Sequence, residues 1–139
     1  MAQREVPRIT VALVTPFTPS GGIDEEGLKR QAKWVAAQGV KAVIPGGTTG
    51  EFAAMSASER LRVLEITREA MPDAFIFANV SACAVGDALE LTRQALSSGT
   101  ARPDGLLLLP PFYHKPFTPE QGEKGVEMFY RCYLESLSK

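Results

Sequence analysis

The chain has 139 residues, of which 45% are hydrophobic and 22% charged, and a formal net charge of −1. This composition is typical of one soluble globular domain, and the near-zero charge gives no reason to expect nucleic acid or an anionic membrane surface as a partner. The apolar runs are too short to span a bilayer, and the polar residues 1–8 lack the apolar core of a signal peptide, which favours a cytoplasmic protein.

Strand-like and helix-like segments alternate along the chain. Strands are predicted at 9–14, 42–44, 74–80 and 105–109, and the last of these is apolar on both faces, as in a parallel strand covered on each side. Helical spacing of apolar residues follows each strand, with predicted helices starting near residues 24, 56, 85 and 118. The fourth helix carries an apolar stripe formed by Val126, Phe129, Tyr130, Tyr133, Leu134 and Leu137.

Two of these helix starts carry strong capping signals. Ser56 and Glu59 are spaced as a capping box, in which each side chain satisfies an otherwise unpaired amide. Thr118 and Gln121 repeat this spacing, with Pro119 at the first helical position. The whole chain, 1–139, therefore contains four βα units. Two architectures fit this pattern: half of an eight-stranded βα barrel, or a small open doubly wound sheet.

Three motifs follow three of the predicted strands. They are Val14-Thr15-Pro16-Phe17, Gly47-Thr48-Thr49-Gly50-Glu51 and Pro110-Pro111-Phe112-Tyr113-His114-Lys115-Pro116. In this order the motifs resemble the dihydrodipicolinate synthase and N-acetylneuraminate lyase family, whose members are Schiff-base aldolases. The resemblance implies a (β/α)8 barrel of TIM type, of which this chain contains the first four βα units, a half barrel.

The family resemblance also implies roles for individual residues. Thr49, with the backbone amides around Gly47 and Gly50, would hold the carboxylate of a small oxo acid such as pyruvate. Thr48 would relay protons, and Tyr113 would extend across a subunit interface to complete that relay, which implies a homo-oligomer. Glu51 would order the loop. No metal and no organic cofactor are implied.

Other parts of the sequence depart from the family pattern. The family uses a lysine on strand six to form the imine and a tyrosine in a YNxP-like stretch on strand five as acid and base, and neither segment is present in these 139 residues. The segments 79–83 and 97–105 also differ from the usual pattern, the first because it is poorer in glycine. The predicted function is therefore a pyruvate-type lyase from which the imine lysine is missing. The alternative is a catalytically inactive short form that binds an oxo acid or associates with other subunits.

Simpler structural interpretations stand beside the functional ones. The Thr48-Thr49 pair could be a plain turn whose hydroxyls cap the next helix, and Tyr113 could pack between prolines. His114 and Lys115 are interpreted as solvated loop residues, because an imine-forming lysine needs a buried setting that lowers its pKa. No metal-ligand spacing and no dinucleotide fingerprint are visible.

Overall fold

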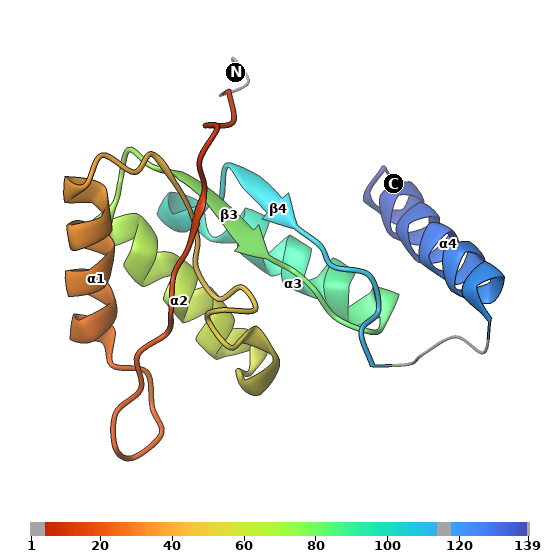
Figure 1. Ribbon diagram of the computed structural model, residues 1–139, viewed down its shortest axis with the longest axis horizontal. Helices are drawn as coiled ribbons and strands as arrows, with labels where there is room; N and C mark the ends of the chain where they lie inside the picture. Colours follow the sequence, from red (N-terminus) through yellow and green to blue (C-terminus); the bar gives the residue numbers. More distant parts are fainter. Residues whose placement is uncertain (1–4, 114–117, 139) are drawn as a thin grey trace.

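A computed structural model describes residues 5–113 and 118–138. Helices and strands alternate along the chain (Figure 1). In chain order the elements are β1 (Val11–Ala12), α1 (Glu25–Ala37), β2 (Ala42–Ile44), the 3₁₀ turn η1 (Phe52–Ala54), α2 (Ala57–Ala70), β3 (Phe75–Asn79), α3 (Val85–Ser97), the 3₁₀ turn η2 (Gly99–Ala101), β4 (Gly105–Leu107) and α4 (Pro119–Leu137).

The four strands form one parallel sheet in the order β1-β2-β3-β4. Val11 pairs with Val43, Val43 pairs with Ile76, and Phe77 pairs with Gly105, so each strand lies beside the strand that precedes it in sequence. This order is that of a βα barrel, in which successive parallel strands are neighbours, and it excludes the doubly wound alternative. The half-barrel prediction is confirmed.

The capping signals act as the sequence predicts. At the start of α2, the Ser56 hydroxyl accepts from the Glu59 amide, and the Glu59 carboxylate accepts from the Ser56 amide at 2.8 Å. Thr118 and Gln121 form the same reciprocal pair at the start of α4. These bonds fix where the chain leaves each loop and enters a helix.

The main core lies between one face of the sheet and the helices. Leu13, Val43 and Ile76 point to this face and are at most 2% exposed. The helices contribute a set of buried residues that pack against them: Ala32, Val35, Leu64, Ala88, Leu91, Ala95 and Tyr133. Since all four helices supply residues to one cluster on one face, they cover the same side of the sheet, and α2 and α3 are seen behind the strands in Figure 1.

The opposite face of the sheet is covered only in part, with Ala42 and Phe75 buried there. Val14 is 46% exposed, and all three residues of β4 are half-buried, although the sequence predicted a strand covered on both faces. That prediction is wrong because only one layer of helices is present in the described part of the chain. The edge strands β1 and β4 are also shorter than the predicted segments 9–14 and 105–109.

Helix α4 packs against α3. Phe129 and Tyr133 are buried, and the Tyr133 hydroxyl lies 2.6 Å from that of Thr92. Leu134 and Leu137 are 59% and 41% exposed, so the predicted apolar stripe is covered in part only. Within residues 5–113 and 118–138, no helix combines the length and apolar character needed to cross a membrane.

Candidate functional site

The loop that follows β2 makes a tight turn at the carboxyl end of the sheet. The Glu51 amide donates to the Thr48 carbonyl at 3.1 Å, and the Phe52 amide donates to the Gly47 carbonyl at 3.2 Å. Glu51 has a φ of 60°, a left-handed conformation that is uncommon for a residue with a side chain. Such strain is retained where the surrounding structure holds it in place, and it is frequent at binding sites.

Side chains from the two neighbouring strands hold both ends of this turn. Beyond the end of β1, the buried Thr15 hydroxyl donates to the Gly50 carbonyl at 2.7 Å. At the end of β3, the Asn79 amide donates to the Gly46 carbonyl at 2.8 Å. The turn that contains Thr48 and Thr49 is therefore anchored on either side.

The glycines of the motif are required by close packing. A Cβ atom at Gly50 would lie 2.8 Å from the Leu13 carbonyl oxygen and 2.9 Å from the Gly46 nitrogen, closer than any real side chain approaches. A Cβ atom at Gly47 would lie 3.3 Å from the Ile44 side chain. Gly50 in particular allows the turn to lie directly against the end of β1.

Thr48 and Thr49 are both exposed at the tip of the turn. Within residues 5–113 and 118–138, neither hydroxyl bonds to another protein group, so neither caps the following helix; Ser56 caps it instead. Two exposed hydroxyls beside a constrained backbone can donate to a carboxylate. The structure brings these two predicted site residues together with Gly47 and Gly50.

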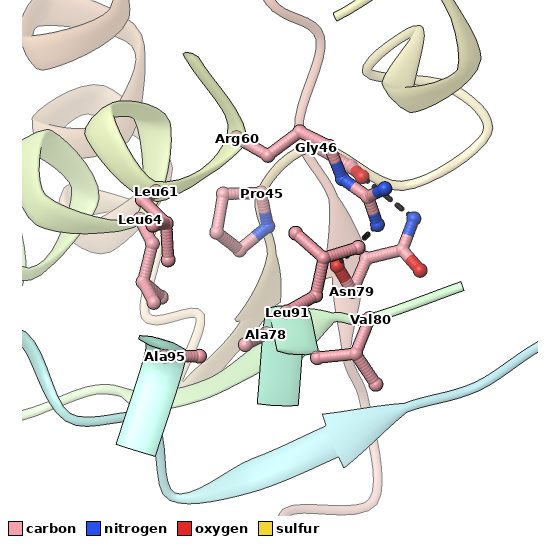
Figure 2. Close-up of a pocket in the computed structure, with 10 residues that line it drawn as sticks. All are labelled: Pro45, Gly46, Arg60, Leu61, Leu64, Ala78, Asn79, Val80, Leu91 and Ala95. Atoms are coloured by element: carbon pink, nitrogen blue, oxygen red, sulfur yellow. Dashed lines mark hydrogen bonds between the residues drawn. The ribbon is translucent and has the colours of Figure 1, made fainter. Parts of the chain in front are cut away.

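Arg60 lies beneath the site, on α2. Its guanidinium donates to the Asn79 carbonyl at 2.6 Å and the Ser81 carbonyl at 3.1 Å, and its charge lies 5.2 Å from the centre of the Phe52 ring. Burial lowers the pKa of the guanidinium. Figure 2 shows Arg60 and Gly46 next to Asn79, whose main-chain carbonyl accepts from Arg60 and whose side-chain amide donates to Gly46.

A small cavity adjoins Arg60 and is lined mainly by apolar side chains of α2, β3 and α3 (Figure 2). Its volume is about 10 Å³. The buried Arg60 Nε has no partner among the residues that the structure describes. The cavity is at the lower limit for one water molecule and is too small for an oxo acid.

Tyr113 lies on the segment that follows β4. Its side chain is 78% exposed, whereas the ring of Phe112 next to it contacts Phe52 edge-on with ring centres 5.4 Å apart. Since Phe52 directly follows the threonine turn, this ring contact joins the segment that carries Tyr113 to that turn.

His114 and Lys115, in the same motif, lie outside the described residues. Among the described residues, no group of three metal-binding side chains occurs.

Comparison with known proteins identifies the family. A sequence model of the dihydrodipicolinate synthetase family matches residues 5–131. The chain belongs to this family. It is 42% identical over 105 residues to 4-hydroxy-tetrahydrodipicolinate synthase of Methanosarcina mazei, covering 76% of this chain and 35% of that protein. With the enzyme of the same name from Natronomonas pharaonis, the identity is 37% over 126 residues, covering 91% of this chain and 40% of the relative.

Solved structures agree with this assignment. Dihydrodipicolinate synthase from Acinetobacter baumannii in complex with pyruvate superposes with a TM-score of 0.78 at 29% identity, over 91% of this chain and 41% of that one. The lysine-bound enzyme from Cyanidioschyzon merolae gives a TM-score of 0.77 at 30% identity, over 92% and 41% of the two chains. The chain thus spans about two fifths of the length of these relatives and matches the first half of their barrel.

Sequence reasoning missed three residues that shape the site. Thr15 was part of a motif but had no assigned role, and Asn79 and Arg60 were not singled out as site residues. A polar residue placed just after an apolar strand was the available signal for Thr15 and Asn79. The position of Arg60 under the site depends on how α2 packs against the sheet, which no local pattern reveals.

Proposed function

We propose that this chain supplies the carboxylate-binding turn and part of the proton relay of a pyruvate-type Schiff-base lyase. The observation that carries this proposal is the turn that presents Thr48 and Thr49 at the carboxyl end of β2, anchored at Gly46 and Gly50. In βα barrels, the loops at this end of the strands form the active face. Family membership supports the same reaction class.

In the proposed reaction, a lysine amine attacks the oxo carbon of pyruvate and water leaves, which forms an imine. The imine accepts the electron pair released at the neighbouring carbon, so that a carbon–carbon bond can form or break there. Thr49 and the amides around Gly47 and Gly50 hold the carboxylate, Thr48 passes protons, and Tyr113 completes the relay in a neighbouring subunit. The lysine and the acid–base tyrosine come from outside these 139 residues.

A second candidate function is binding without catalysis. The turn and its anchors are present within this chain, so that an oxo acid can bind although no imine forms. The chain then acts as an inactive short form, alone or associated with longer subunits. The two candidates differ in whether the complete working protein contains an imine lysine.

Titration of the ¹⁵N-labelled chain with pyruvate, followed by NMR, tests the shared first step. We expect the amide signals of residues 47–51 to shift with pyruvate and to stay in place with methyl pyruvate, which keeps the oxo group but lacks the carboxylate charge. Shifts with both ligands, or with neither, would rule out carboxylate binding by this turn. Borohydride reduction of the complete working protein in the presence of pyruvate then separates the candidates. Only a protein that contains the imine lysine gains a covalent adduct.

A further inference from the structure

Two buried side chains connect the loop after β2 with the segment after β4. The Asn79 amide nitrogen donates to the Gly46 carbonyl at 2.8 Å. The amide and hydroxyl of Ser81 both donate to the Asn79 side-chain oxygen, at 3.0 and 2.5 Å, and the Leu109 amide donates to the Ser81 hydroxyl at 2.9 Å. Asn79 is 8% exposed and Ser81 is fully buried.

The direction of these bonds is fixed by the main chain at both ends. The Gly46 carbonyl can only accept, and the amides of Ser81 and Leu109 can only donate. The Asn79 side chain must therefore turn its nitrogen toward Gly46, and the Ser81 hydroxyl must accept from Leu109 while it donates to Asn79. Gly46, Asn79 and Ser81 are buried and Leu109 is half-buried, so the loss of one member leaves another polar group without its partner in this network.

Both ends of this connection adjoin proposed site residues. Gly46 stands two positions before Thr48, and Leu109 lies on the segment after β4 that leads to Tyr113. Arg60 holds the same unit from the side of α2 through the main-chain carbonyls of Asn79 and Ser81. The family resemblance assigns no role to residues 79–83.

We propose that Asn79 and Ser81 are positioning residues that fix the Thr48-Thr49 turn relative to the segment that carries Tyr113. This proposal rests on the proposed role of the turn in binding an oxo acid. Neither residue touches the substrate. They set where the proposed carboxylate site lies relative to the proposed proton relay.

Two substitutions each remove the hydrogen bond at one end of this connection and keep the bond at the other end. Asn79→Asp at pH 7 removes the donor to Gly46 and keeps the acceptor for Ser81, whose two donors favour the ionised carboxylate. Ser81→Ala removes the acceptor of the Leu109 amide and leaves the bond from Asn79 to Gly46. Thr67→Val is the matched control, because Thr67 is equally buried and its hydroxyl bonds to the Val63 carbonyl within its own helix.

Amide hydrogen exchange of the full 139-residue chain, measured by NMR, is the readout. Asn79→Asp is expected to accelerate exchange at Glu51 and Phe52, and Ser81→Ala at Leu109, each by about 2- to 10-fold relative to Val35 in α1. Each variant should leave the other end at the wild-type rate, and Thr67→Val should leave both ends unchanged. Uniform acceleration in all variants, or a local change at only one end, would overturn the proposal.

Pyruvate binding distinguishes this proposal from the proposed function. If the wild-type chain binds pyruvate, Asn79→Asp should weaken that binding about 10-fold, and unchanged affinity would contradict the positioning role. If the wild-type chain does not bind pyruvate, the proposed function fails. In that case the two-ended exchange pattern still decides whether Asn79 and Ser81 fix the turn.

Discussion

The hydroxyl of Thr15 donates to the carbonyl of Gly50 at 2.7 Å and joins the end of the first strand to the loop after the second. Thr15 is 4% exposed, so this carbonyl is satisfied by a side chain in a place that water does not readily reach. Gly50 in turn lies so close to Leu13 that no larger residue fits there. The hydroxyl and the glycine together determine how the threonine turn is seated.

Thr15→Val should lower the free energy of unfolding by about 1–3 kcal/mol, because it keeps the shape of the side chain and leaves the Gly50 carbonyl without a donor. Urea denaturation measures the change. Thr67→Val should cost less, since the Val63 carbonyl that loses the Thr67 hydroxyl keeps its helical amide partner. Equal losses of unfolding free energy in the two variants would show that the bond from Thr15 to Gly50 stabilises the fold no more than the bond of Thr67 within its helix.

Thr49→Val should weaken pyruvate binding by roughly 10- to 100-fold, or about 1–3 kcal/mol, because one hydroxyl contact to the carboxylate is lost. Thr48→Val should mainly lower turnover in an enzyme that also contains the imine lysine, since a relay hydroxyl acts while protons move. Steady-state kinetics and circular dichroism separate these effects from unfolding. Normal kinetics in both variants would show that the turn has only a structural role. If Thr48→Val weakened binding and Thr49→Val lowered turnover, the roles of the two threonines would be the reverse of those proposed.

The strand and helix positions were largely predictable, because local signals determine them. The helix starts at Ser56 and Thr118 and the strand at Ala42–Ile44 occur as the sequence predicts. The end of β4 was not predictable. The amide of Leu109 donates to the side chain of Ser81 instead of continuing the ladder, and this contact depends on how separate loops meet.

The candidate site was predictable only in part. Thr48 and Thr49 were identified from their motif and are exposed in one turn, as a binding role requires. Their roles stay predictions. The anchors Thr15 and Asn79 act through contacts 35 and 33 positions away in sequence, which a single sequence does not reveal.

Asp104→Asn should lower the free energy of unfolding by about 3 kcal/mol, because it leaves Arg68 charged without its carboxylate partner. The two side chains are 14% and 13% exposed, and Arg68 Nη2 lies 2.6 Å from the carboxylate. Glu90→Gln is the matched control, since the pair between Glu90 and Arg93 is more than half exposed and should contribute less than about 1 kcal/mol. Similar losses of unfolding free energy in the two variants, measured by urea denaturation, would show that the partly buried pair contributes no more than the exposed one.

Stability should fall on acidification, in part through Glu59. Hydrogen bonds from the hydroxyl and amide of Ser56 lower the pKa of Glu59 in the folded protein below its ordinary value of 4.5. The unfolded chain therefore binds the proton at higher pH, and the stabilisation, complete above about pH 4.5, is lost as the pH falls through the lower, folded pKa.

The variant Glu59→Gln should show a smaller drop in urea midpoint between pH 5 and pH 3 than the wild type. Glu123→Gln, on α4, is the control and should keep the wild-type profile. If Glu59→Gln follows the wild-type profile as well, the capping carboxylate does not contribute to acid sensitivity.

The chain should self-associate, because β1 and β4 are open edges and apolar residues near β1 are uncovered. Ile9 is 72% exposed and Val14 is 46% exposed. Ile9→Lys with Val14→Lys should shift sedimentation toward the monomer, whereas Leu96→Lys, at a 38% exposed position on α3, should not. A wild-type chain that sediments as a monomer at all micromolar concentrations would disprove this expectation.

The strand order has a consequence for synthesis on the ribosome. Each strand pairs with the one made just before it, so no pairing waits for a distant, later part of the chain. Pairing of consecutive strands closes a shorter loop than pairing with a more distant strand would, and so costs less chain entropy. The sheet can therefore grow one βα unit at a time as the chain emerges, and the threonine turn acquires its second anchor as soon as β3 has been translated and paired.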